Sequence, residues 1–146
     1  MHIVLVTKDR KQLLKGSIAD DIKQKIFDIA NANGYEIIAM ETDKDHIHFL
    51  LSYDTKDRVW DIVKIVKQQT TYYLWQKYSS CLSKQYWKKI FWSDGYFACS
   101  IGEVSSAMIQ KYIENQGEWL RIYMASSTAW RQWVSAYEKR KNLIYE

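Results

Sequence analysis

Two of the chain's three histidines alternate along one short segment, His46-Ile47-His48. In a β-strand, residues i and i+2 project from the same face, so the two imidazoles would stand side by side. Neutral imidazole nitrogens bind several divalent transition metals and accept magnesium less readily. The spacing therefore predicts a site for one divalent cation at His46 and His48, although two such histidines are also often mere polar residues of a half-exposed strand.

A second pair of chemically capable residues is Tyr112 and Gln116, four positions apart. In a helix these two side chains lie on one face, one turn from each other. A phenol there can act as a nucleophile, and the neighbouring amide oxygen can complete a metal shell. The chain has 11 tyrosines, and most of them must serve packing or the surface, so chemistry alone does not single out Tyr112.

The elements that must position these residues follow the order βαββαβα. The β-branched run 3–7 predicts a strand. Ser17 then predicts an N-cap, with Asp20 and Asp21 in the first turn of a helix that ends at Asn33-Gly34. The later elements are a strand at 35–41, a strand at 46–53, a helix from Arg58 to about Tyr78 capped by Asp57, a last strand at 96–100 and a helix from Ser105 to about Gln116.

The short polar turn between the second and third strands predicts an antiparallel hairpin. One antiparallel sheet with helices on one face buries the apolar stripes most economically, as in ferredoxin-like or RNA-recognition-like α+β sandwiches. No linker or shift in composition marks a second domain. We therefore expect a single domain over residues 1–146, in which 117–146 form a C-terminal helical extension.

Composition excludes several classes of protein. A hydrophobic share of 47% in 146 residues is too high for a disordered chain, and no apolar run reaches the roughly 18–20 residues of a membrane helix. Cys81 and Cys99 lack the spacing of a metal or redox motif, which favours free thiols in a reducing cytoplasm. The net charge of +4 permits an anionic partner without requiring one.

Three ordered blocks give a more specific indication: HIVLVTKDRK, KDHIHFLLS and FWSDGYFACSIGEVSSAMIQKYIENQ, which together reach from Met1 to about Gln116. They resemble the TnpA-type, single-tyrosine HUH transposases of the insertion-sequence 200/605 class. The family's His-hydrophobic-His motif is matched by His46-Ile47-His48, and its Tyr-x-x-x-Gln motif by Tyr112 and Gln116. The chain departs from the family at Lys44, where a proline is usual.

The resemblance implies that the chain is a DNA strand transferase of the prokaryotic cytoplasm. The family cleaves and rejoins single-stranded DNA with hairpin ends by transesterification, through a 5′-phosphotyrosine formed here by Tyr112. It implies Mg²⁺ or Mn²⁺ held by His46, His48 and Gln116. It also implies a homodimer in which the tyrosine helix of one subunit completes the site of the other.

Basic and aromatic residues are candidates for DNA contact. Lysine and arginine bind phosphates without reading sequence, and the basic candidates are Lys8, Arg10, Lys11, Lys15, Lys88, Lys89 and Lys111. Trp92 and Tyr96 are candidates for stacking on extruded bases, but aromatic residues at strand ends more often serve packing. The basic residues have the parallel alternative of forming a solvated face.

Three other functions fit parts of the sequence. A domesticated or inactive relative would bind structured single-stranded DNA without cleaving it. A replication initiator or plasmid relaxase would share the HUH chemistry, but on a longer chain. An RNA-recognition-like domain with incidental histidines would require the ordered blocks to match by accident. Covalent capture of a hairpin-bearing substrate distinguishes the transposase from all binding-only alternatives.

Overall fold

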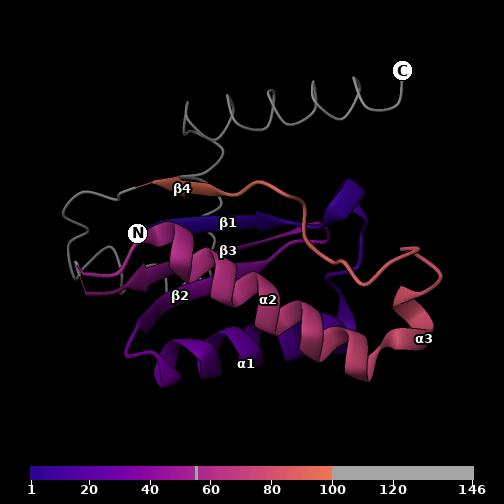
Figure 1. Ribbon diagram of the computed structural model, residues 1–146, viewed down its shortest axis with the longest axis horizontal. Helices are drawn as coiled ribbons and strands as arrows, with labels where there is room; N and C mark the ends of the chain where they lie inside the picture. Colours follow the sequence, from indigo (N-terminus) through magenta and orange to yellow (C-terminus); the bar gives the residue numbers. More distant parts are fainter. Residues whose placement is uncertain (55, 100–146) are drawn as a thin grey trace, which may run out of the picture. The chain divides into compact units, whose positions relative to one another are not determined.

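The computed structural model describes residues 1–54 and 56–99, which belong to a compact unit, Met1–Ile101. The expected helix at 105–116, with Lys111, Tyr112 and Gln116, and the extension 117–146 lie outside the described residues. The elements, shown in Figure 1, are β1 (His2–Val6), the 3-10 turn η1 (Lys8–Arg10), α1 (Gly16–Ala32), β2 (Glu36–Thr42), β3 (His46–Ser52), α2 (Val59–Lys77), α3 (Ser79–Leu82) and β4 (Phe97–Cys99).

Four strands form one antiparallel sheet in the order β2-β3-β1-β4. Helices α1 and α2 pack against each other on one side of this sheet (Figure 1). The described part of the chain thus confirms the expected antiparallel α+β sandwich. In the described residues, no helix combines the length and the apolar character that a membrane span requires.

Alternation along the two central strands decides which side chains meet the helices. Ile3 and Leu5 of β1 join the hydrophobic core with Ile47, Phe49 and Leu51 of β3. The residues between them therefore project from the opposite face of the sheet. That face carries the histidines, because the antiparallel register pairs Val4 with His48 and Val6 with His46.

Helix α1 begins two residues earlier than the sequence predicted, because its N-cap is Lys15 and not Ser17. Gly16 enters it with a φ of +59°, and Lys15 occupies the N-cap without a side-chain hydrogen bond. The glycine's left-handed backbone makes the turn into the helix, so Ser17 is not the N-cap. Asp20 and Asp21 also lie beyond the first turn, contrary to the prediction.

The end of α1 agrees with the sequence. Asn33 Nδ2 donates a hydrogen bond to the Ile29 carbonyl at 2.8 Å, and Gly34 leaves the helix with a φ of +76°. This conformation is inexpensive for glycine and reverses the chain toward β2.

Helix α2 contributes a buried stripe, which consists of Ile62, Val63, Val66, Thr70 and Leu74. Its N-cap is Arg58, without a side-chain cap, rather than the expected Asp57. The two helices are joined at their surface by Asp21 of α1, whose carboxylate accepts hydrogen bonds from Lys77 Nζ (2.8 Å) and from the Tyr78 hydroxyl. These bonds hold the pKa of Asp21 below its usual value.

The segment between α3 and β4 has little regular structure but is tied to the core. Trp92 forms an isolated bridge with Thr7 at the end of β1, and its indole Nε1 donates to Thr70 Oγ1 at 2.9 Å. The ring is only 6% exposed. Packing, the alternative to base stacking, is therefore the role that the structure shows for Trp92.

Candidate functional site: a histidine pair on β3

His46 and His48 lie side by side on β3, as the alternation predicted. Their ring centroids are 5.8 Å apart, and the ring planes are 29° from parallel. His48 is buried, and the side chain of His46 is 17% exposed. Two imidazoles that bind one ion through bonds of about 2.1 Å have centroids no more than about 6.5 Å apart. The pair is therefore close enough to share a cation.

Asp45 orients the first of these rings. Its Oδ1 lies 2.9 Å from His46 Nδ1, while its Oδ2 accepts a hydrogen bond of 2.9 Å from Arg10 Nε. The hydrogen bond with His46 is the largest cause that keeps the pKa of Asp45 below its usual value. Burial raises this pKa, and the positive charge of Arg10 lowers it further. An ionised carboxylate only accepts hydrogen bonds, so the proton of the neutral His46 ring lies on Nδ1, and Nε2 is the nitrogen with a lone pair that can bind a metal.

The backbone around Asp45 is fixed by Thr7 and by the turn that carries Arg10. The Asp45 carbonyl accepts a hydrogen bond from the Thr7 amide at 2.9 Å and another from Thr7 Oγ1 at 3.2 Å. Asp9 and Arg10 both take left-handed backbone conformations, with φ of 59° and 51°. Such values cost a non-glycine residue energy, so the loop is held in a strained shape that places Arg10 against Asp45.

The third histidine, His2, belongs to the same face. Its ring stands edge-on to His48, with centroids 6.1 Å apart, and edge-on to Phe97 at 6.0 Å. Burial, followed by the charge of the chain's amino terminus, lowers the pKa of His2 to about 4. His2 is thus neutral at physiological pH and adds no positive charge beside the pair. Sequence reasoning missed this neighbour, because it depends on the register between β1 and β3.

A complete metal shell needs more than the two imidazoles. Within residues 1–54 and 56–99, no group of three or more His, Cys, Asp or Glu side chains has the arrangement of a metal site. Glu41 stands opposite His48 in the register of β2 and β3, but its Oε1 lies 3.6 Å from Lys23 Nζ. The residues present fit two ligands of a cation. The expected third ligand, Gln116, lies outside the described residues.

Several of the candidate DNA-contact residues cluster around η1 and the segment before β4. Lys8 Nζ lies 3.8 Å from Asp94 Oδ2, and Lys11 Nζ lies 5.7 Å from the centroid of the Tyr86 ring. Lys88 Nζ is placed 5.1 Å from the centroid of the Trp87 ring. The side chains of Lys15, Lys88 and Lys89 are exposed. DNA contact by these residues stays a prediction.

The fold and the strand-borne histidines define a ferredoxin-like α+β domain with a candidate metal site. Residues 1–116 match the family described as "Transposase IS200 like". The chain belongs to this transposase family. The family thus confirms the resemblance carried by the ordered sequence blocks.

Individual relatives agree with this assignment. The chain is 36% identical to the ISDra2 transposase TnpA of Deinococcus radiodurans over 115 aligned residues. The aligned stretch covers 79% of this chain and 81% of that protein. It is 28% identical over 117 residues to the transposase for insertion sequence element IS200 of Salmonella typhimurium, covering 80% and 76% of the two chains.

Solved structures show the same fold. The crystal structure of a Deinococcus radiodurans R1 protein assigned as a transposase superposes with a TM-score of 0.64 at 33% identity, over 79% of this chain and 88% of that one. A REP-associated tyrosine transposase bound to a REP hairpin superposes with a TM-score of 0.52 at 14% identity, over 80% and 67% of the two chains. At that identity the second likeness concerns the fold alone.

Proposed function

We propose that this transposase cleaves and rejoins single-stranded DNA at insertion-sequence ends through a covalent bond to Tyr112. The observation that carries the proposal is the pairing of His46 and His48 on one face of β3, with Asp45 orienting His46, in a chain of this family. The order of the reaction follows from the nucleophile. The Tyr112 oxygen bonds to the scissile phosphorus, the bond from phosphorus to the 3′-oxygen breaks, and the 3′-oxygen takes up a proton as the phenol loses its own.

The covalent intermediate conserves the energy of the broken bond. A 3′-hydroxyl later attacks the 5′-phosphotyrosine, reseals the strand and returns the tyrosine, so neither water nor a nucleotide cofactor is needed as a nucleophile or energy source. A phenol has a pKa of about 10 and is mostly protonated at neutral pH, which is why its attack needs electrostatic help.

His46, His48 and Gln116 would hold Mg²⁺ or Mn²⁺. Such an ion supplies Lewis-acid polarisation of a phosphate and offsets negative charge in the transition state. Asp45 fixes the tautomer of His46, and the neutral His2 ring adds no positive charge of its own beside the pair. In this proposal β3 carries two of the ligands, Asp45 just before the strand orients His46, and Tyr112 supplies the nucleophile.

The experiment is covalent capture on a hairpin-bearing single strand taken from the flanks of the gene. Wild-type chain is expected to form an adduct that survives denaturing electrophoresis with Mn²⁺ present. Tyr112→Phe should abolish the adduct while hairpin binding remains, and His46→Ala with His48→Ala should remove metal-dependent cleavage. An adduct of undiminished yield from Tyr112→Phe would refute the role of Tyr112, and binding without any adduct would favour the binding-only relative.

We propose further that the protein acts as a homodimer whose sites take Tyr112 from the partner subunit. Mixing the Tyr112→Phe chain with the His46→Ala, His48→Ala chain tests this arrangement. If the tyrosine acts in trans, each mixed dimer contains one intact site and cleavage returns. If it acts in cis, no mixed dimer contains an intact site and the mixture stays inactive.

A further inference from the structure

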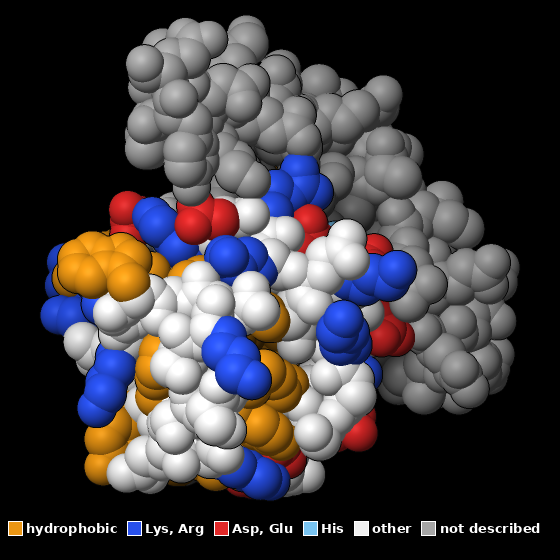
Figure 2. All heavy atoms as spheres, turned by 90° about the vertical axis from the view of Figure 1, so that its right-hand side faces the viewer, with side chains coloured by type: hydrophobic (Ala, Val, Ile, Leu, Met, Phe, Trp, Pro, Cys, Tyr) orange, Lys and Arg blue, Asp and Glu red, His pale blue; other side chains and the backbone are white. Residues whose placement is uncertain are grey.

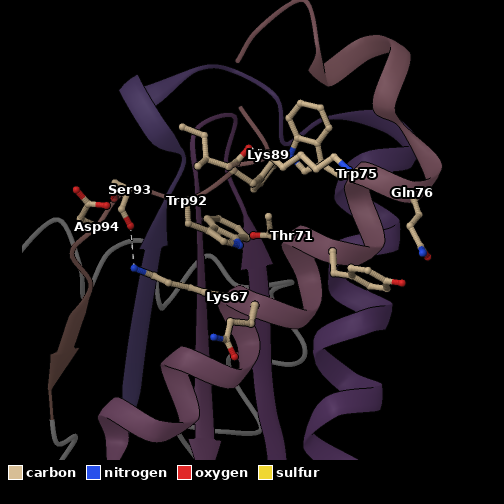
Figure 3. A pocket seen from close by; sticks show the side chains of 12 residues that line it. Lys67, Thr71, Trp75, Gln76, Lys89, Trp92, Ser93 and Asp94 are labelled. Atoms are coloured by element: carbon tan, nitrogen blue, oxygen red, sulfur yellow. Dashed lines mark hydrogen bonds between the residues drawn. The ribbon is translucent and has the colours of Figure 1, made fainter. Parts of the chain in front are cut away.

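A pocket of about 790 Å³ lies between α2 and the segment that leads into β4 (Figure 3), and its lining includes none of the histidines. One wall comes from residues 67–76 of α2 and the other from residues 89–94. Pockets of roughly 300–1,000 Å³ are typical of small-ligand sites. The pocket is therefore large enough for a planar ligand together with a charged group.

Aromatic rings form much of the pocket wall. Trp75 Nε1 donates to the Ile90 carbonyl at 2.9 Å, and Trp92 Nε1 is bonded to Thr70. Both indole N–H groups are thus used within the protein, so these rings are fixed in place. Trp92 is buried, whereas the partly exposed Trp75 offers a ligand its π surface. Tyr72, which also lines the pocket, is 68% exposed. The wall is suited to stacking rather than to hydrogen bonding.

One polar atom in the pocket lacks a partner. Ser93 is 4% exposed, and its Oγ makes no hydrogen bond with the described residues. A buried hydroxyl left in this state costs free energy. The nearby Lys67 does not serve it, because its Nζ donates to the backbone carbonyls of Ser93 (2.8 Å) and Gly95 (2.9 Å), as Figure 3 shows for Ser93. A ligand with a donor or acceptor would satisfy the hydroxyl.

Positive charge lies beside this wall. Lys89 lines the pocket and is exposed, and the preceding residues Trp87 and Lys88 form an exposed cation–π pair. Figure 2 faces this end of α2 and shows Lys and Arg side chains around exposed hydrophobic ones. Exposed rings beside lysines suit a ligand that combines a π surface with a phosphate.

The pocket wall and the histidine pair flank the same strand end. Segment 91–93 is bonded to β1 through Lys8 N to Phe91 O (2.8 Å) and Ser93 N to Val6 O (2.9 Å). On the other side of β1, the amide of Thr7 is bonded to the carbonyl of Asp45, next to His46. The end of β1 therefore links the pocket wall to the start of the strand that carries the histidine pair.

We propose that this pocket binds an unpaired nucleobase of the single-stranded DNA. The base stacks against Tyr72 and Trp75, accepts or donates a hydrogen bond at Ser93 Oγ, and places its phosphate beside Lys89. The inference rests on the proposed function, because it identifies a contact for the same DNA.

The test measures binding of the full-length protein to a fluorescent dT decamer by anisotropy. Tyr72→Ala is expected to weaken binding about tenfold, the loss typical of one stacked base. Ser93→Ala should also weaken binding, while its thermal midpoint stays equal to or above that of the wild type, because the change removes an unsatisfied hydroxyl. Trp60→Ala is the matched control, since Trp60 is an exposed aromatic residue of the same helix outside the pocket.

Equal affinity of Tyr72→Ala and wild type for the decamer would overturn the proposal. It would also be overturned if Trp60→Ala lost as much affinity as Tyr72→Ala, because the DNA would then bind exposed aromatic residues in general. Photo-cross-linking of a 5-iodouracil decamer to Tyr112→Phe separates this site from the chemistry. A cross-link within residues 67–76 or 89–94, the two walls of the pocket, supports the proposal even if no substrate gives an adduct. A cross-link elsewhere refutes the pocket, even if wild-type protein forms the Tyr112 adduct.

Discussion

Replacing Asp45 with asparagine tests whether this side chain tunes the histidine pair. Asparagine keeps an oxygen that can accept the His46 Nδ1 proton at the observed 2.9 Å, but it removes the negative charge shared with Arg10. A ring that loses a charged hydrogen-bond partner becomes a poorer electron donor at Nε2. Loss of such an outer partner typically lowers metal affinity about 10- to 100-fold, or roughly 1.4–2.7 kcal/mol.

The stability cost of the same change should be small. Asp45 and Arg10 side chains are 19% and 34% exposed, and a partly exposed ion pair contributes about 1 kcal/mol or less. Asp45→Asn should therefore weaken Mn²⁺ binding much more than it lowers the free energy of unfolding.

Calorimetric titration of Mn²⁺ into the full-length protein gives the affinity, and urea denaturation gives the stability. Arg10→Met serves as the control, because it breaks the ion pair but keeps the carboxylate on His46. Its Mn²⁺ affinity should fall less than that of Asp45→Asn. Unchanged affinity in Asp45→Asn, with folding intact, would refute the orienting role.

Three further changes test the packing. Trp92→Phe should lower the free energy of unfolding by about 1–3 kcal/mol in urea denaturation, because it leaves Thr70 Oγ1 without its 2.9 Å donor in the core. Asp21→Asn should lower stability at neutral pH. Since the folded-state pKa of Asp21 is depressed, the difference from wild type should close as pH falls below about 4, and a gap that persists at pH 2 would contradict the assigned bonds to Lys77. Asp9→Gly should raise the thermal midpoint, because glycine adopts a φ of 59° without strain, and a lower midpoint would show that the aspartate compensates.

Local patterns in the sequence predicted the sheet and the histidine pair. Alternation within His46–Ser52 is enough to place both imidazoles on one face, since it needs no knowledge of the neighbouring strands. The predicted start of α1 was wrong, because the chain enters the helix through the left-handed backbone of Gly16 and not through a side-chain cap at Ser17. Capping motifs describe side chains and do not reveal such a backbone conformation.

The surroundings of the pair could not be predicted in the same way. Arg10 and Asp45 are separated by 35 residues, and their contact depends on how η1 folds back over the start of β3. The proposed base pocket joins α2 to residues 89–94, and His2 meets His48 only through the strand register. These features arise from long-range packing, for which a single sequence offers no periodic signal.

The junction at Thr7 has a consequence for how such proteins can diversify. The buried Thr7 holds Asp45 through its backbone amide and hydroxyl, and it holds Trp92 through a β-bridge. A substitution of Thr7 would therefore disturb both the orientation of His46 and the shape of the pocket. Tyr72, on the outer surface of α2, is free of that coupling. Lineages that acquire new DNA preferences are therefore expected to accumulate changes on the outer helix surface, while the threonine junction varies little.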